Sequence, residues 1–132
     1  MAVQFNIKID QGADKILNFF IEVLTNPDLP YDVCTNPYVP LDLTSYTAVL
    51  EVSSDFGEPP VLTLSSTGTN PALQLEGSTG EIIATFSSSS TSAIPLTEGC
   101  WEGIYQMELY SGTLVKRPVQ GEFIISRELI TN

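Results

Sequence analysis

Short runs in which apolar residues alternate with polar ones recur along the whole chain, and they constrain its fold more than any other feature. In the first run, residues 3–9, every second side chain is apolar. A period of two places such side chains on one face of an extended strand. Comparable runs occupy residues 46–52, 61–64, 73–75, 81–86, 99–110, 114–119 and 121–126. The pattern predicts a chain built from short strands.

Turn-forming residues separate these runs, as in Asp10–Asp14 and Glu76–Gly80. Gly, Pro, Asn, Asp and Ser favour turns through backbone freedom, a fixed φ or a short polar side chain. Turn signals about every 8–12 residues are typical of a β-sandwich. A length of 132 residues suits one domain. We therefore predict a single all-β domain over residues 1–132, an Ig-like antiparallel β-sandwich of about 7–9 short strands.

Two segments have a local pattern of their own. Residues 15–23 carry apolar side chains on both faces of the expected strand, which is typical of a central strand or of one covered by another chain. Residues 87–94 are rich in Ser and Thr. We expect them to form a turn or a single helical turn that closes one end of the sandwich, with Ile94 as an apolar plug.

A Pro-rich segment, residues 25–40, interrupts the strand pattern as a long loop insertion. It contains four prolines, and because proline lacks an N–H donor and fixes φ, regular structure is not expected there. Loops of this length are often functional. Its apolar side chains either pack back on the sandwich or reach a neighbouring protein, and the sequence leaves both open. Three of them are candidate partner contacts: Tyr31, Tyr38 and Val39.

The charge of the chain argues against several classes of partner. Five Lys and Arg stand against 16 Asp and Glu, a formal net charge of −11. Nucleic-acid binding needs Lys and Arg to displace counterions from phosphates, and anionic membrane surfaces attract basic proteins. We therefore expect neither nucleic acid nor a membrane as a partner. Many acids fall at outward positions or in loops, which predicts neighbours that supply cations.

Few residues suit catalytic or metal chemistry. The chain has no His, which excludes Ser-His-Asp triads and His-containing zinc sites. Cys34 and Cys100 lack CxxC spacing; their pairing stays open, and Cys100 is interpreted as a small buried apolar residue. Asp10, Gly12 and Asp14 resemble a fragment of a calcium loop but fit an ordinary turn. We expect no enzyme, no cofactor and no metal site.

Aromatic residues in the run over residues 99–110 divide between its two faces. Trp101 and Tyr105 share one parity with other apolar residues and are expected in the core. Tyr110 has the opposite parity and precedes residues 111–112, the expected two-residue hairpin loop. Tyr110 is therefore a fourth candidate partner contact. With the tyrosines of the Pro-rich segment, it would form the binding surface of a carbohydrate-binding module.

Several motifs follow one another in a fixed order. An alternating strand with a Gly-Ala/Asp turn leads to a hydrophobic strand, a DLTGYT signature, a GTITLTLS strand, a capping turn, a GxYxYDLEL strand and a GxxxVxxxxT ending. The corresponding segments are Phe5–Asp14, Ile16–Val23, Asp42–Thr47 (with Ser45 in place of Gly), Gly80–Ser87, Ser89–Ile94, Gly103–Leu109 and Gly121–Thr131. In this order the chain resembles small Ig-like tail proteins of tailed bacteriophages and the N-terminal domain of phage baseplate upper proteins.

The resemblance covers nearly the whole chain and implies a function. It implies a non-enzymatic virion structural protein, a tail or baseplate component or a tail-fibre connector, synthesised in the host cytoplasm. Its partners would be other tail, baseplate or fibre subunits, in multiple copies of a symmetric assembly. The Pro-rich segment is longer than is usual in these proteins. Two alternatives stay open: a capsid decoration protein, and a carbohydrate-binding module for host attachment.

Overall fold

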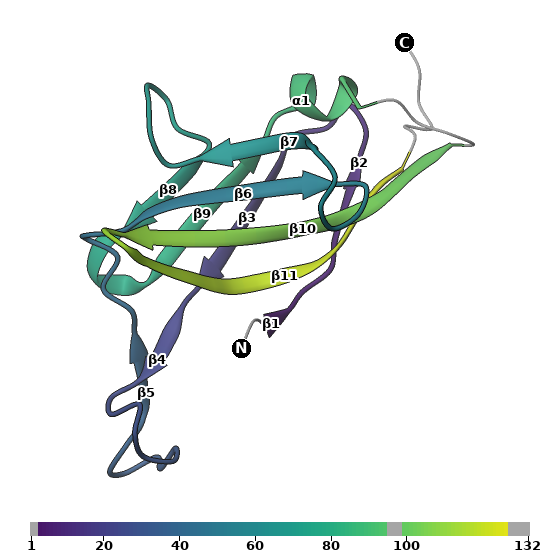
Figure 1. The fold of residues 1–132 in the computed structure, drawn as a ribbon. Coiled ribbons are helices and arrows are strands. Elements are labelled where there is room, and N and C mark those ends of the chain that lie inside the picture. The colour runs from purple at the N-terminus through teal and green to yellow at the C-terminus, as the bar shows by residue number, and fades with distance from the viewer. Residues whose placement is uncertain (1–2, 95–98, 127–132) are drawn as a thin grey trace.

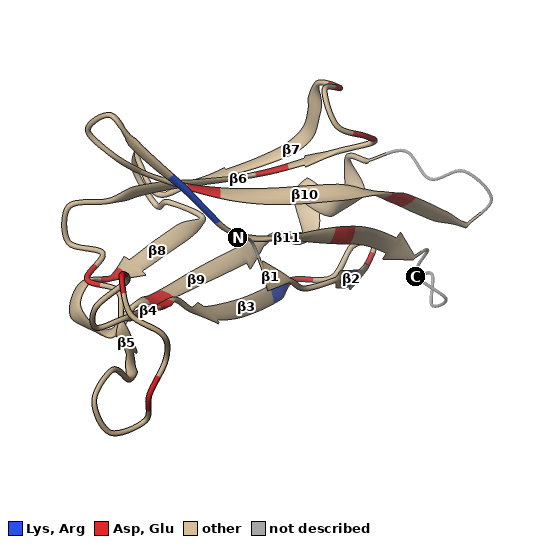
Figure 2. Cartoon of the chain, turned by 60° about the horizontal axis from the view of Figure 1, so that its bottom comes forward, with Lys and Arg blue, Asp and Glu red and all other residues tan. Residues whose placement is uncertain are grey.

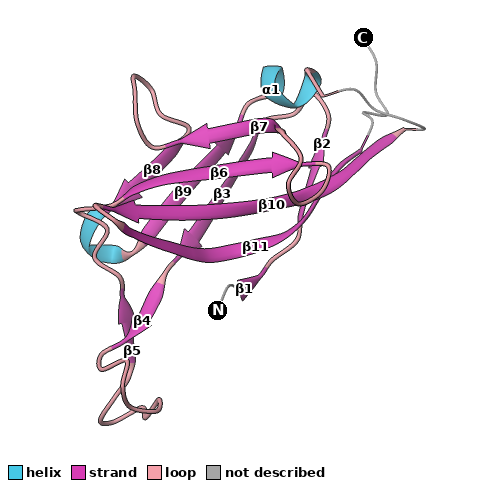
Figure 3. Ribbon diagram, viewed as in Figure 1, coloured by secondary structure: helices cyan, strands magenta, loops and turns pink. Residues whose placement is uncertain are grey.

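A computed structural model describes residues 3–94 and 99–126, and strands make up most of these ranges (Figure 1; Figure 3). The two helical pieces are single turns, η1 (Gly77–Thr79) and α1 (Ser88–Ser92). The strands are β1 (Val3–Gln4), β2 (Ile7–Asp10), β3 (Lys15–Phe20), β4 (Glu22–Leu24), β5 (Tyr38–Pro40), β6 (Thr47–Ser53), β7 (Pro60–Ser65), β8 (Leu73–Glu76), β9 (Glu81–Phe86), β10 (Cys100–Ser111) and β11 (Leu114–Ser126). The all-β prediction is confirmed. The described ranges hold eleven strands and not the expected 7–9, because residues 3–9 and 15–23 each form two strands and Tyr38–Pro40 adds another. Within the described ranges, no helix has the length and apolar character needed to cross a membrane.

The strands form two facing sheets, which we call the body, and a separate two-stranded hairpin. One sheet has six strands in the order β1-β11-β10-β6-β7, with β2 also paired to β11. The other has the order β3-β9-β8 and lies behind the first in Figure 1. Neighbouring strands are antiparallel except β1 and β2, which run parallel to β11. The expected purely antiparallel pairing is wrong at this edge, because the chain between β2 and β11 crosses to the other sheet and returns.

One apolar core fills the space between the two sheets. Its buried side chains occupy alternate positions of strands from both sheets, as period two predicts. In β6 they are Ala48, Leu50 and Val52, and in β9 they are Ile82, Ala84 and Phe86. Tyr105 of β10 is buried and Trp101 packs against the same core. The core positions predicted for these two aromatic residues are therefore confirmed.

Helix α1 closes one end of the body. Its N-terminus is capped by Ser87, whose hydroxyl accepts a hydrogen bond from the amide of Ser90, and Ile94 is only 2% exposed. The helical turn with Ile94 as a plug is thus confirmed. The turn at Asp10–Asp14, between β2 and β3, is bound to this helix, because the amide of Ser88 donates to Asp14 Oδ1 over 2.7 Å. The Asp14 carboxylate therefore has a structural role, which fits the interpretation of Asp10–Asp14 as an ordinary turn.

Two expected strands are interrupted by contacts that are remote in sequence. Residues 3–9 divide into β1 and β2 at Phe5 and Asn6. The Phe5 carbonyl accepts from the Tyr105 hydroxyl, and Asn6 Oδ1 accepts from the amide of Glu122. Residues 15–23 divide into β3 and β4 at Ile21, where the chain leaves the body.

Three further expectations were wrong. Of the two interpretations of β3, the central strand is wrong, because β3 lies at a sheet edge. Ile16 and Phe20 on its outer face are exposed, and cover by another chain stays a prediction. Cys100 is exposed because its parity in β10 is opposite to that of Tyr105, and neither cysteine is bonded. The β10–β11 hairpin turns at residues 112–113, one residue later than expected, since Ser111 still pairs with Leu114.

Candidate functional site

A hairpin of residues 22–40, which we call the arm, projects from one end of the body (Figure 1). It consists of β4, the intervening loop and β5, with Glu22 opposite Pro40 and Leu24 opposite Tyr38. None of its residues belongs to the hydrophobic core. The Pro-rich segment therefore does not pack back on the body. The expectation that it lacks regular structure was wrong for Tyr38–Pro40, where Pro40 ends a strand without interrupting its ladder.

The base of the arm is fixed to the body by backbone hydrogen bonds. The amide of Ile21 donates to the carbonyl of Gly80 over 2.8 Å, and the Ile21 carbonyl accepts from the amide of Leu41 over 2.9 Å. On the return side, Asp42 Oδ1 accepts from the amide of Thr44 over 3.0 Å. The Thr44 hydroxyl also donates to Asp42 Oδ1. This bond first, and then the bond from the Thr44 amide, lowers the pKa of Asp42. Both ends of the arm are thus oriented by the body.

The loop at the tip of the arm is organised around Asn36, a polar residue that is only 2% exposed. Its amide nitrogen lies 3.0 Å from each of three carbonyl oxygens, those of Asn26, Leu29 and Pro30. Its Oδ1 accepts from the amide of Asn26 over 2.7 Å. A side-chain amide offers two donors and an acceptor, which suits a loop whose prolines supply carbonyls without amides. Asn36 therefore holds the tip in one shape.

Asp32 stabilises the outer turn of the same loop. Its Oδ1 accepts from the amides of Cys34 over 2.8 Å and of Thr35 over 3.1 Å. These two bonds, from Cys34 first, hold the pKa of Asp32 below its ordinary value, since hydrogen bonds to a carboxylate favour its charged form. Paired backbone bonds between Asp32 and Asn36 close the turn.

Apolar side chains cover this ordered tip and face solvent. Tyr31 and Tyr38 stack on each other, with ring centroids 5.0 Å apart and planes inclined by 21°. Both are about half exposed, Leu29 is 54% exposed and Val33 is 72% exposed. Exposed apolar side chains gathered on one element mark interaction sites more often than scattered ones do. The arm tip is the candidate functional site.

The structure gathers three of the four predicted contact residues on the arm. Tyr31, Tyr38 and Val39 lie there, with Val39 the least exposed of the three. Tyr110 lies apart, on the outer face of β10 opposite Thr47. The Tyr110 hydroxyl donates to Glu108 Oε1 over 2.8 Å, and this bond raises the pKa of Tyr110.

Two residues of the site have no role in the sequence prediction. Leu29 stands between two prolines and gives no periodic signal. Asn36 precedes Pro37 and has the pattern of an ordinary turn starter. The signal that could have indicated Asn36 is the high proline content of the segment, because a loop with few amide donors needs a side-chain donor for its carbonyls.

The arm carries one sign of charge. Residues 22–40 include Glu22, Asp28 and Asp32 and no Lys or Arg. Figure 2 shows acidic positions on the arm, whereas the basic positions of β11 lie at the start of that strand on the body. Within residues 3–94 and 99–126, no three His, Cys, Asp or Glu side chains gather as a metal site would require. The arm tip is thus suited to apolar contact with a complementary, cationic partner.

No protein-family model matches this chain, and no curated protein sequence matches it. The geometry of the arm and the order of the strands therefore carry the functional argument.

Proposed function

We propose that this chain is a non-enzymatic structural protein of a tailed-phage virion, in the tail or baseplate, and that the arm is its docking element. The observation that carries the proposal is the arm tip, which holds Tyr31, Tyr38 and Val33 exposed at a distance from the body. Aromatic anchors dominate the energy of protein interfaces. Their fixed position lowers the entropy lost on binding, and Asn36 supplies that fixation here.

An Ig-like assignment of the body supports this role. In the Ig arrangement, strands G, F, C and C′ face strands B, E and D. The order β11-β10-β6-β7 opposite β3-β9-β8 follows that scheme. The arm then becomes an insertion between strands B and C. The assignment rests on strand order, because β3 has no Cys and β6 has no Trp, residues that mark antibody domains. The ordered motifs that resemble phage tail proteins supply the virion context.

Mass spectrometry of purified virions tests the proposal. The phage that encodes this chain should carry it in gradient-purified particles, in a fixed ratio to the tail proteins. Its absence from such particles would reject the virion role. Electron cryo-microscopy density on the capsid lattice, with none on the tail, would identify a decoration protein instead.

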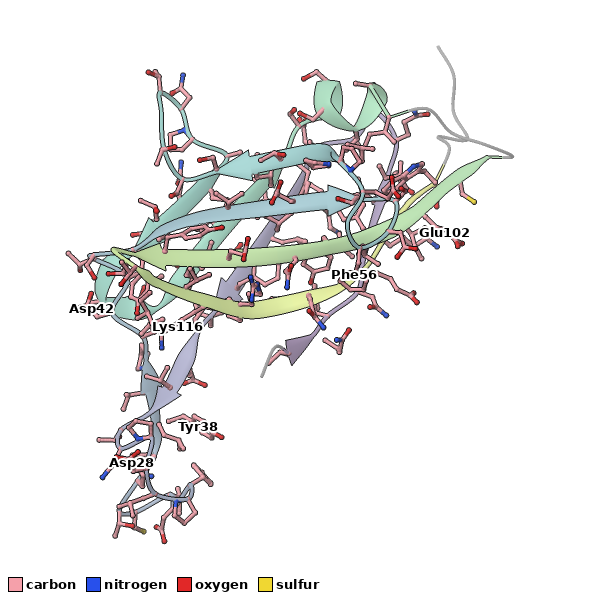
Figure 4. All side chains as sticks on the ribbon, viewed as in Figure 1. Asp28, Tyr38, Asp42, Phe56, Glu102 and Lys116 are labelled. Carbon is pink, nitrogen blue, oxygen red and sulfur yellow. The ribbon has the colours of Figure 1, made fainter. Side chains whose placement is uncertain are left out.

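The docking role of the arm has its own experiment. A phage that encodes Tyr31→Ser and Tyr38→Ser should incorporate at least about tenfold less of the protein, since aromatic anchors contribute roughly 2 kcal/mol or more each. Phe56→Ser is the matched control, because Phe56 is an exposed aromatic residue in the β6–β7 loop, away from the arm (Figure 4). Equal incorporation of both variants would show that the tip is not the docking element.

Glycan binding is a second candidate function, favoured by the stacked pair of Tyr31 and Tyr38. Their ring faces form an exposed aromatic surface of the kind on which sugar rings pack. A glycan array with purified protein should then show binding that Tyr31→Ser removes. A signal no higher than background, or one unchanged in the variant, would reject this candidate.

A further inference from the structure

A groove of about 640 Å³ lies on the open side of the body, where the edges of the two sheets meet the base of the arm. Its walls come from β1, β3, β4 and β11 and are mainly apolar. Side chains that face it and are more than 40% exposed include Val3, Phe5, Phe20 and Val115. Apolar walls of this extent without a covering element mark a binding surface.

Two of the five basic residues of the chain line this groove, Lys116 and Arg117. Lys116 stands opposite Leu109 in the β10–β11 ladder, and opposite residues share a face of the sheet. Because Leu109 is buried, the side chain of Lys116 extends from the core-facing side of β11, and there it lines the groove. Arg117 Nε already contacts Glu108 Oε2 over 2.8 Å, and this is the one ion pair within the described ranges. Lys116 is therefore the unpaired cation of the groove.

The arm tip matches this groove, with apolar side chains for its apolar walls and a carboxylate for Lys116. It presents the apolar side chains of Leu29, Tyr31 and Val33 together with Asp28, and it has no base. Glu22 and Val23 at the base of the arm form part of the groove wall. The tip of the same arm does not reach the groove, because the hydrogen bonds of Ile21 fix the base and the tip points away from the body (Figure 1). Figure 4 shows Asp28 on the outer part of the arm and Lys116 on the body beside the arm's base. The fitting occupant is thus the arm of another copy.

We propose that the arm tip of one copy inserts into the groove of a second copy, with Asp28 facing Lys116. Such a contact joins two different surfaces, so each copy keeps a free arm or a free groove for the next one. Contacts of this kind close into rings or continue as filaments. The inference rests on the proposed docking role of the arm and names its partner as a second copy of this chain.

Sedimentation velocity with purified protein at physiological salt tests the contact. The unmodified chain should self-associate as its concentration rises, because salt screens the repulsion between two copies of net charge −11 more than it screens a close, partly buried Asp28–Lys116 pair. Lys116→Glu and Asp28→Lys should each raise the dissociation constant at least about tenfold, because each brings like charges together. Lys8→Glu is the matched control, since it makes the same charge change outside the groove and should leave association unchanged.

Mixing the two charge variants then identifies which surfaces meet. An equimolar mixture of Lys116→Glu and Asp28→Lys restores opposite charges at every contact between unlike copies, so it should associate where each variant alone does not. A mixture that stays monomeric would overturn the pairing of Asp28 with Lys116. A chain that is monomeric at all concentrations would overturn self-association. Either result can coexist with the protein's presence in virions, so it is distinguishable from failure of the proposed function.

Cross-linking from the tip gives an independent map. Cys34 is exposed on the arm and accepts a maleimide-benzophenone photoprobe in a Cys100→Ser background. Illumination should yield intermolecular cross-links to peptides that contain residues 3–5 or 115–117. Cross-links confined to other surfaces would overturn the insertion.

Discussion

The carbonyl oxygen of Ile21 occupies the space in which a Cβ atom of Gly80 would stand. A Cβ built at Gly80 lies 2.5 Å from that oxygen and 3.1 Å from the amide nitrogen of Leu41, and Gly80 has a φ of +70°. The glycine therefore permits two things at once. It turns the chain from η1 into β9, and it lets the first residue beyond β3 approach closely enough to direct the arm.

Gly80→Ala should consequently loosen the base of the arm and destabilise the body. The left-handed φ costs about 1–3 kcal/mol for a residue with a Cβ, and the clash with Ile21 adds to that cost. Urea unfolding should show a loss of roughly 3 kcal/mol or more. Hydrogen exchange at the Leu41 amide should accelerate, because its acceptor is displaced.

Gly57→Ala is the control for this prediction. Gly57 has a φ of +85°, yet a Cβ there would have no atom within 4 Å. It should show the backbone strain alone, about 1–3 kcal/mol, with no change in exchange at Leu41. Equal losses of stability in the two variants would mean that the close approach of Ile21 has no energetic consequence.

The same contact explains where prediction from sequence stops. The strand β6 is evident from its alternation, because burial against a single core imposes period two. The alternation of β3 continues into β4 without a break in pattern, but the chain leaves the body at Ile21. The bonds that impose this break come from Gly80 and Leu41, which are remote in sequence and leave no local signal.

The candidate site was predictable in its composition but not in its shape. Tyr31 and Tyr38 are recognisable as apolar residues in a long loop. The loop between them is organised by the buried side chain of Asn36, whose place before a proline predicts only an ordinary turn. The sequence predicts Tyr110 as a further contact because the alternating pattern places its side chain on the outer face of the strand. Parity does not say where along the body that face lies, and the hydroxyl of Tyr110 is bonded to Glu108.

Asn36→Ala should disorder the arm tip while leaving the body folded. The substitution removes the donors for the carbonyls of Asn26, Leu29 and Pro30. Each buried polar group left without a partner costs about 1–3 kcal/mol, and the arm contributes nothing to the core. Hydrogen exchange and limited proteolysis should therefore increase within residues 26–37.

Fluorescence of Trp101, the single tryptophan of the chain, reports on the body in the same variant. Its urea midpoint should stay close to that of the unmodified protein. A large drop in that midpoint would show that the arm and the body unfold together. Unchanged proteolysis of the tip would show that Asn36 does not organise it.

Tyr105→Phe should weaken the attachment of the N-terminal strand. The buried hydroxyl of Tyr105 donates to the Phe5 carbonyl at the break between β1 and β2, and burial raises the pKa of Tyr105, so the hydroxyl stays protonated in the basic range. Loss of this bond should cost about 0.5–1.5 kcal/mol in urea unfolding and speed exchange at the Phe5 amide.

Tyr110→Phe is the matched variant on the outer face of the body. Its hydroxyl bonds to the side chain of Glu108 beside solvent, so water can replace the lost partner. Its loss of stability should stay below about 0.5 kcal/mol. Equal losses of unfolding free energy in the two variants would show that the buried bond from Tyr105 to Phe5 stabilises the fold no more than the bond of Tyr110 beside solvent.

The turn at the end of the arm should open in acid. The pKa of Asp32 in the folded chain lies below its ordinary value of 3.8 because the amides of Cys34 and Thr35 donate to its carboxylate. A group with a lowered folded pKa contributes its full stabilisation above the ordinary value. That contribution is lost as pH falls through the lower, folded value. The amide signals of Cys34 and Thr35 in NMR spectra should therefore titrate together below pH 3.8.

Two substitutions separate this effect from general acid unfolding. Asp32→Asn removes the titrating carboxylate, so both amide signals should lose their pH dependence in this range. Asp28→Asn removes a carboxylate from the same loop without touching the bonds to Cys34 and Thr35, and the titration should persist. A titration that survives in Asp32→Asn would assign it to another carboxylate, and Asp32 would then have no part in the pH response of the arm.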